Sequence, residues 1–130
     1  MKFSKGLLTV LLTTCILLMA FSSWAGDFNG DGTDDLVWLH DTNGAVAIWF
    51  IAPSPKNEAV ILQACVVGSV NPLEWNIAFV GDVNGDGTSD LVFHSRIDSS
   101  VAVWFLDGCS LGAVSFLGST GDMGWKIEPG

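Results

Sequence analysis

The fold is decided by one stretch of sequence that occurs twice in the chain. Residues 26–51 read GDFNGDGTDDLVWLHDTNGAVAIWFI, and residues 81–106 read GDVNGDGTSDLVFHSRIDSSVAVWFL. Aligned without gaps, with Gly26 matched to Gly81, the two stretches agree at 14 of 26 positions. A second pair, GSVNPLEWNI from Gly68 and GSTGDMGWKI from Gly118, repeats further along. Because self-similarity of this kind is the signature of a repeat protein, the sequence predicts about two copies of one structural unit.

Short strands account for each copy, and helical periodicity is absent after Ala25. Residues 46–51 and 101–106 are apolar on both faces, a pattern typical of strands in a sheet that is covered on both sides. The segment Asp41–Gly44, DTNG, predicts a hairpin turn because Asn and Gly tolerate positive φ. The expected strands are 36–39, 46–51, 64–67 and 75–80, followed by 91–94, 101–106, 114–117 and 125–128.

This pattern predicts an all-β fold with two four-stranded antiparallel blades of the β-propeller type. A sheet that is apolar on both faces must be stacked between two others, and radial stacking of such sheets makes a propeller of about 4 to 8 blades. Two blades form an incomplete ring, so we expect the chain to form a homo-oligomer that completes a propeller, or to be a fragment of a longer ring. In an assembled ring, the strand expected at 125–128 would complete the first blade of a neighbouring chain.

The segment 1–25 has the anatomy of a secretory signal peptide. A basic start with Lys2 and Lys5 precedes an uncharged, mostly apolar run from Gly6 to Phe21, which is short for a membrane span. Small residues then precede a cleavage site after Ala25. We therefore expect a secreted, extracellular protein, with the periplasm or cell surface as alternatives, and no membrane insertion after removal of the signal. The expected organisation is a signal peptide over 1–25, a first repeat over 26–75, and a second repeat with the start of a third over 76–130.

The acidity of the chain excludes some partners. The formal net charge is −9, and removing the signal takes away two of the five basic residues and none of the 14 acidic ones, which gives −11. Such a chain lacks the basic surface that nucleic acids and anionic lipids require. It is suited to cations wherever its carboxylates are clustered.

The segment that the two copies share most closely places oxygen-bearing side chains at alternating positions of a tight loop. Positions 1, 3, 5 and 9 are Asp, Asn, Asp and Asp, position 6 is Gly, and position 7 is Thr, whose backbone carbonyl can point inward. Ca²⁺ takes about 6–8 oxygen ligands in flexible geometry, whereas Mg²⁺ requires a stricter octahedron, and zinc and copper favour the His and Cys that these loops lack. We expect two calcium sites, with ligands Asp27, Asn29, Asp31, Thr33 and Asp35 in the first loop and Asp82, Asn84, Asp86, Thr88 and Asp90 in the second.

Two other interpretations of these loops compete with a calcium site of this kind. Turn chemistry alone favours Asp, Asn and Gly, but three carboxylates so close together in one loop repel one another without a cation. EF-hands share the first six positions but need Glu at position 12 and flanking helices, and dockerin loops likewise lead into helices. Position 12 is here Trp38 or Phe93, inside an expected strand. Asp34 is not an expected ligand, because the second copy has Ser89 there.

These motifs resemble the FG-GAP or VCBS-type repeats of the integrin-α-like β-propeller family. The resemblance covers nearly all of residues 26–130. It rests on residues 26–32, 35–38 and 44–49 in the first copy and on 81–87, 90–93 and 101–104 in the second. It implies calcium between the first two strands of each blade, and adhesion, carbohydrate binding or scaffolding at the propeller surface. The chain departs from the family in blade number, because the family's rings usually have seven blades, which two-blade chains cannot make.

Calcium is expected to support the fold, and aromatic burial is expected to contribute more to stability. Catalysis is not expected: His40 and His94 do not recur between the copies, and the sequence has no nucleophile-and-base motif. Cys65 and Cys109 remain after removal of the signal, and a disulfide between them is an open alternative. The aromatic residues expected to be buried are Trp38, Trp49, Phe50, Trp75, Phe79, Phe93, Trp104, Phe105 and Trp125.

These features predict a secreted, non-enzymatic calcium-binding repeat module with an extracellular binding or adhesion role, whose partner is a glycan or another cell-surface ligand. The first alternative is a carbohydrate-binding lectin assembled from two-blade chains, in which Trp75 and Trp125 would stack on sugars. The second alternative is an accessory fragment of a larger secreted hydrolase.

Overall fold

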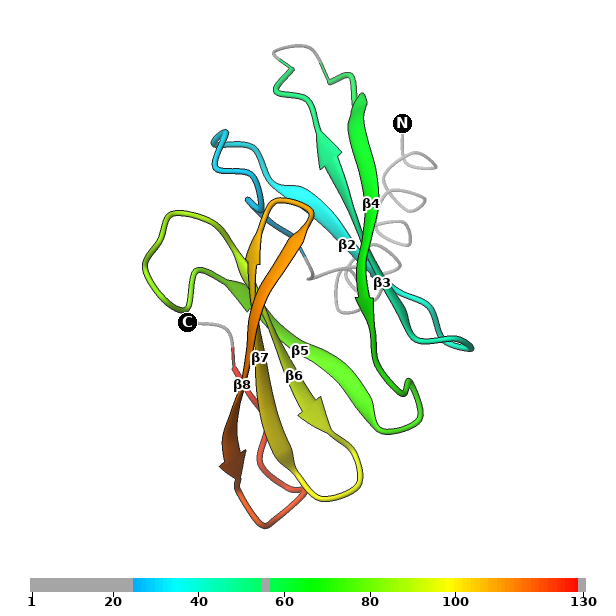
Figure 1. Cartoon of the computed structure of the whole chain (residues 1–130), viewed down its shortest axis with the longest axis vertical. Helices are drawn as coiled ribbons and strands as arrows, with labels where there is room; N and C mark the ends of the chain where they lie inside the picture. Colours follow the sequence, from blue (N-terminus) through cyan, green and yellow to red (C-terminus); the bar gives the residue numbers. More distant parts are fainter. Residues whose placement is uncertain (1–24, 55–56, 129–130) are drawn as a thin grey trace, which may run out of the picture.

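The computed structural model describes residues 25–54 and 57–128, so the expected signal peptide lies almost wholly outside the described residues. Within this part the chain forms two four-stranded antiparallel sheets and no helix (Figure 1), which confirms the all-β, two-blade prediction. The first sheet contains β1 (Ala25–Gly26), β2 (Asp35–Leu39), β3 (Ala45–Ile51) and β4 (Ile61–Ser69), in that order. The second contains β5 (Trp75–Gly81), β6 (Asp90–Ser95), β7 (Ser100–Asp107) and β8 (Ser110–Ser119).

The two sheets share one register, as the repeat predicts. Leu36 faces Trp49 across β2 and β3, and the equivalent Leu91 faces Trp104 across β6 and β7. The third and fourth strands of each sheet pair with register shifts at corresponding places. The outer strands β4 and β8 extend beyond the expected ranges 64–67 and 114–117 at both ends.

The two hairpin turns reach the same conformation with different residues. In the expected DTNG turn, Gly44 has φ of 71°, and its N–H donates to the carbonyl of His40 at 2.9 Å. The equivalent Ser99 has φ of 64° without being a glycine, a conformation that costs energy for an L-residue. Its hydroxyl is buried and forms a hydrogen bond with Nε2 of His94 at 3.0 Å. Side-chain contacts therefore stabilise this turn, although the backbone preference of serine does not favour it.

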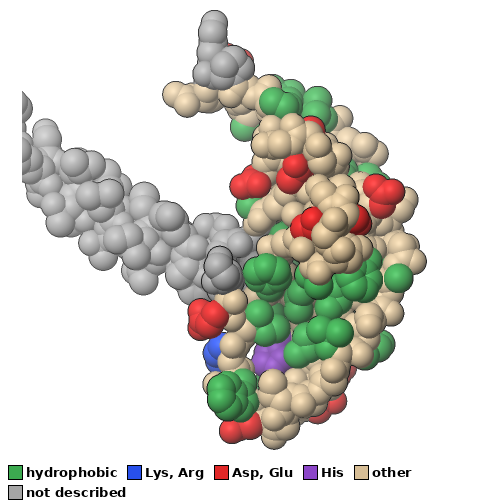
Figure 2. Space-filling view, turned by 90° about the vertical axis from the view of Figure 1, so that its left-hand side faces the viewer, with side chains coloured by type: hydrophobic (Ala, Val, Ile, Leu, Met, Phe, Trp, Pro, Cys, Tyr) green, Lys and Arg blue, Asp and Glu red, His purple; other side chains and the backbone are tan. Residues whose placement is uncertain are grey.

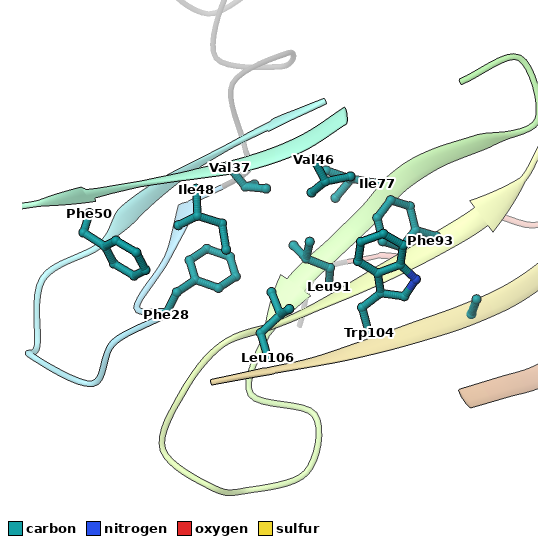
Figure 3. Packing of buried hydrophobic residues seen from close by; sticks show 11 residues of the cluster. Phe28, Val37, Val46, Ile48, Phe50, Ile77, Leu91, Phe93, Trp104 and Leu106 are labelled. Carbon is teal, nitrogen blue, oxygen red and sulfur yellow. The ribbon is translucent and has the colours of Figure 1, made fainter. Parts of the chain in front are cut away.

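One hydrophobic core lies between the two sheets (Figure 3). It is formed by one face of the first sheet and the opposite face of the second, because residues on a strand alternate between faces. The first sheet and its β1–β2 loop contribute Phe28, Val37, Val46, Ile48 and Phe50, and the second contributes Ile77, Leu91, Phe93, Ala102, Trp104 and Leu106.

One disulfide and two backbone hydrogen bonds also connect the two sheets. A disulfide joins Cys65 in β4 to Cys109 in the β7–β8 turn, which settles the alternative that the sequence left open. The N–H of Ser89 donates to the carbonyl of Asp27 at 2.8 Å, and that of Gly108 donates to the carbonyl of Phe28 at 3.1 Å.

The prediction of a strand at 125–128 is wrong. These residues come after β8 in the chain and form no strand. A turn at Asp122 precedes them, where its side chain accepts the N–H of Gly124 at 2.7 Å. The equivalent strand β5 is held by pairing with β6, and no later hairpin among the described residues offers residues 125–128 such a partner. No described residue belongs to a helix with the length and hydropathy that crossing a membrane requires.

Burial of the aromatic residues also differs from expectation at particular positions. Trp38 is 48% exposed and Trp125 is 65% exposed, whereas Phe28, which was not expected in the core, is fully buried. The cause for Trp38 is that only one face of the first sheet is covered in this chain: burial alternates along β2 and β3, while every residue of β6 is buried.

Candidate metal centre

Two loops with one hydrogen-bond pattern connect β1 to β2 and β5 to β6. In the second loop, Oδ1 of Asp82 accepts the N–H groups of Gly85 at 2.8 Å and Asp86 at 3.1 Å, and Oδ2 accepts that of Gly87 at 2.9 Å. Asp27 accepts the three equivalent N–H groups of the first loop at 2.7, 3.2 and 2.8 Å. The glycine at position 6 has φ of 84° in the first loop and 91° in the second, so the tight turn requires glycine there.

The aspartate at position 9 anchors each loop to the third strand of its sheet. Asp90 is fully buried, and its two carboxylate oxygens accept the N–H groups of Leu106 and Val83, each at 3.0 Å. Asp35 is equally buried and accepts those of Ile51 and Phe28, each at 3.0 Å. A buried charge is tolerated only with such partners, so this aspartate has a structural role in addition to any role as a ligand.

Three carboxylates of the second loop converge. One carboxylate oxygen from each of Asp82, Asp86 and Asp90 lies within 4.8 Å of the others. Two oxygens bound to the same Ca²⁺ at about 2.3–2.6 Å are at most about 5.2 Å apart, so this spacing fits one shared ion. A carboxylate oxygen that accepts an N–H group keeps a lone pair for a cation. The group can therefore hold a metal ion.

The first loop is less converged than the second. Among residues 25–54 and 57–128, no other three His, Cys, Asp or Glu side chains bring their ligand atoms this close together. The equivalent Asp27, Asp31 and Asp35 therefore do not converge to the same degree. The hydrogen bonds of the two loops differ at position 7. Thr88 donates both its N–H and its hydroxyl to Oδ1 of Asp86, each at 3.0 Å, whereas Thr33 donates only its N–H to Asp31, at 2.8 Å.

The electrostatics of both loops favour a cation. Burial raises the pKa of Asp90, and the charge of Asp86 raises it further, against the opposing effect of the backbone N–H groups that Asp90 accepts. Burial likewise raises the pKa of Asp35, with smaller contributions from neighbouring carboxylates. By contrast, the hydrogen bond from the N–H of Thr88 lowers the pKa of Asp86. Negative charge is thus concentrated beside a buried carboxylate, and a divalent cation would relieve it.

The two loops lie against each other. Besides the hydrogen bond between Ser89 and Asp27, a Cβ placed on Gly30 of the first loop would lie 3.7 Å from Cγ2 of Thr88 in the second. The two loops therefore meet where the first sheet joins the second.

The structure places the remaining expected ligands within the same loops. The side-chain oxygens of Asn29 and Asn84 accept the N–H groups of Asp31 and Asp86, each at 3.2 Å. Sequence reasoning missed the role of loop position 2, where Phe28 is buried in the core and the equivalent Val83 is 45% exposed. The one sequence feature that indicated this difference was the aromatic Phe28 in the first loop where the second loop has the aliphatic Val83.

The other residues singled out in the sequence lie elsewhere. Trp75 lines a cavity of about 190 Å³ with Phe93, Trp104 and Phe116, beside the segment that links the sheets. Its ring centroid lies 6.3 Å from that of Phe116. Trp125 does not line this cavity. The histidines contribute to turns: His40 accepts the N–H groups of residues 42 and 43 on Nδ1, and His94 contacts Ser99.

Comparison with known proteins agrees with this architecture. The profile of a family described as the FG-GAP-like repeat matches residues 27–93, just over half of the 130-residue chain. The matched segment runs from the first loop through the second loop and into β6. No curated protein and no solved structure matches the chain significantly.

Proposed function

Because the chain belongs to the family of FG-GAP-like repeat proteins, we propose that it is a secreted module that binds Ca²⁺ and acts in extracellular binding or adhesion. FG-GAP-like repeats and a disulfide are both typical of extracellular proteins, and the chain has both. The calcium-binding part of the proposal is carried by one observation, the convergence of carboxylate oxygens from Asp82, Asp86 and Asp90.

Calcium fits this donor set better than other common ions. The loop offers carboxylates, an amide oxygen and backbone carbonyls but no nitrogen or sulfur ligand, which disfavours zinc and copper. The oxygens come from alternating positions of one irregular loop, and Ca²⁺ accepts variable geometry more readily than Mg²⁺ does. Asp82, Asn84, Asp86, Thr88 and Asp90 would hold the ion in the second loop, and Asp27, Asn29, Asp31, Thr33 and Asp35 in the first.

The ion would support the structure of the two loops. When bound, Ca²⁺ supplies positive charge that neutralises the clustered carboxylates. Each loop is tied to its sheet through the buried aspartate at position 9 and to the other sheet through the pair Ser89 and Asp27. Neutralising the charge of the loops therefore favours the packing of the two sheets against each other. It would also stabilise any binding surface that the two sheets form together.

Isothermal titration calorimetry tests this proposal. Wild type, Asp86→Asn and Asp34→Asn are compared after removal of bound metal. Asp86→Asn removes one charge from the converged group and keeps an oxygen that can accept the N–H of Thr88. Asp34→Asn removes one exposed charge at position 8 of the first loop, where no ligand is expected. We expect calcium uptake by wild type and Asp34→Asn, and at least tenfold weaker binding at one site in Asp86→Asn. Unchanged affinity in Asp86→Asn would overturn the proposal.

A second candidate function is carbohydrate binding, favoured by the aromatic cavity at Trp75. Sugars stack on aromatic rings, and the cavity is lined by Trp75 and Phe116, by the buried Phe93 and Trp104, and by Asn71 and Ser69 as polar residues. Under this alternative, a glycan array finds a ligand whose binding is lost in Trp75→Ala and kept in Trp125→Ala, since Trp125 lies outside the cavity. A blank array together with calcium binding supports the module without a lectin function.

A further inference from the structure

The two repeats carry matching apolar residues on one face, but only the second repeat buries them. We call Leu36, Trp38, Ala47, Trp49 and Ile51 of β2 and β3 the outer face of the first sheet. Leu36 is 40% exposed and Trp38 is 48% exposed, and the other three are partly exposed. The equivalent residues of the second sheet are at most 7% exposed: Leu91, Phe93, Ala102, Trp104 and Leu106.

The buried set shows what this kind of face binds. In the second sheet it packs on the opposite face of the first sheet, around Val37, Val46, Ile48 and Phe50. The interface between the two repeats is therefore head-to-tail, because each repeat contributes a different face. A head-to-tail interface between similar units leaves one face unused at each end and can repeat until it closes or extends.

The outer face already has the geometry of its buried counterpart. The rings of Trp38 and Trp49 have centroids 4.9 Å apart and planes tilted by 50°. The equivalent Phe93 and Trp104, inside the core, have centroids 4.9 Å apart and a tilt of 51°. The exposed aromatic pair therefore needs no rearrangement to make the contact that the buried pair makes, which lowers the cost of binding.

We propose that the outer face of the first sheet docks on the β5–β8 sheet of a second copy of this chain, in the same head-to-tail manner that joins the two sheets within one copy. The contact surface on the second copy is the face with Val92, Val101, Val103 and Phe105, which are the repeat equivalents of Val37, Val46, Ile48 and Phe50. The interface thus continues one that exists within each chain and uses the same classes of residue.

A glycine marks the receiving position. Within one chain, Trp104 packs over Gly68, where a Cβ would lie 2.8 Å from the indole ring. The repeat equivalent of Gly68 is Gly118, since Val46 pairs with Gly68 and Val101 pairs with Gly118. A Cβ placed on Gly118 would meet nothing within 4 Å. In the proposed contact, Trp49 of one copy takes the place above Gly118 of the next that Trp104 has above Gly68.

The receiving side is apolar and is partly covered within one chain. Figure 2, in which the left-hand side of Figure 1 faces the viewer, shows hydrophobic side chains gathered below a group of acidic side chains and beside a histidine. Val101 and Phe105 are partly exposed, while Val92 and Val103 are buried. At one end of this sheet, Met123, Lys126 and Ile127 line a cavity of about 240 Å³ with Asn76 and His94. Docking therefore requires the segment after β8 to shift.

Molar mass in solution tests the proposal. Light scattering on a sizing column is run over a range of protein concentrations, in calcium and in chelator, on wild type, Trp38→Glu and Ile97→Glu. Ile97 is 67% exposed in the β6–β7 turn, outside the outer face, and serves as the matched control. We expect wild type and Ile97→Glu to form multimers whose molar mass is a whole-number multiple of the monomer mass. We expect Trp38→Glu to remain monomeric and to have the same circular dichroism spectrum as wild type. Monomeric wild type in both buffers, or multimers in Trp38→Glu, would overturn the proposal.

A mixing experiment tests the head-to-tail arrangement. Phe105→Glu blocks the receiving face, so it is expected to be monomeric alone and to form a dimer, and nothing larger, when mixed with Trp38→Glu. Dimers of Phe105→Glu alone would show that outer faces pair with each other and would contradict the arrangement. The contact does not rest on calcium binding, so multimers that persist in chelator support it even where calorimetry shows no calcium uptake.

Discussion

The indole ring of Trp104 in β7 lies directly over Gly68 in β4 of the other sheet, so closely that a Cβ on Gly68 would approach two ring carbons to 2.8 Å. We predict that Gly68→Ala destabilises the protein by about 1–3 kcal/mol, because a side chain forced into a packed interface shifts its neighbours. Chemical denaturation measures this. Gly112→Ala is the control: a Cβ there would meet only the carbonyl oxygen of Phe105 at 3.4 Å, and equal losses in both variants would contradict the packing.

The disulfide between Cys65 and Cys109 closes a loop with a sequence separation of 44 residues. Cross-linking restricts the unfolded chain, so we predict that the double variant Cys65→Ser, Cys109→Ser loses about 2–4 kcal/mol of unfolding free energy. Urea denaturation with and without reductant measures the loss. Reductant should lower the unfolding free energy of wild type and leave that of the double variant unchanged. Two free thiols in the oxidised, folded protein would contradict the pairing.

The buried Asp90 accepts two backbone N–H groups, from Leu106 and Val83. Asp90→Ala leaves both donors without a partner, so we predict a loss of about 2–4 kcal/mol in the absence of calcium. Asp34→Ala, which removes an exposed carboxylate, should change stability by less than about 0.5 kcal/mol. Thermal denaturation in chelator separates this structural role from calcium binding. An Asp90→Ala variant as stable as wild type would show that the anchor contributes nothing.

Metal removal should weaken the fold without abolishing it. Extracellular calcium modules bind with Kd of about 10⁻⁴–10⁻³ M, so at about 1 mM calcium each site adds about 0.4–1.4 kcal/mol. For a domain of this size we expect chelation to lower Tm by about 2–10 °C, with the sheet signal retained at room temperature. Differential scanning fluorimetry in calcium, magnesium and chelator checks this. A Tm that is the same in calcium and in chelator contradicts the prediction.

Sequence reasoning predicted the features of the fold that local chemistry determines. The repeat that matches Gly26 to Gly81 established the equivalence of the sheets, and the apolar runs located most strands. The turn at Gly44 followed from the backbone freedom of Asn and Gly. The loop motif also pointed to Asp82, Asp86 and Asp90, whose carboxylates converge, because spacing within one short loop is a local property.

Features that depend on long-range packing were not accessible in this way. Trp38 and Phe93 occupy equivalent positions, yet one is exposed and the other buried, because the outcome depends on what covers each sheet. Residues 125–128 share the pattern of β5 but lack a hairpin to pair with among the described strands, so the pattern alone gave the wrong answer. The pairing of Cys65 with Cys109 and the anchoring of Asp90 by Leu106 likewise depend on segments brought together by the fold.

A crystal structure of the protein grown in calcium tests the central claim most directly. The prediction is strong electron density for an ion at about 2.3–2.6 Å from carboxylate oxygens of Asp82, Asp86 and Asp90, with an anomalous signal consistent with calcium. A structure grown in millimolar calcium that shows only water or side-chain hydrogen bonds in this loop would contradict the assignment.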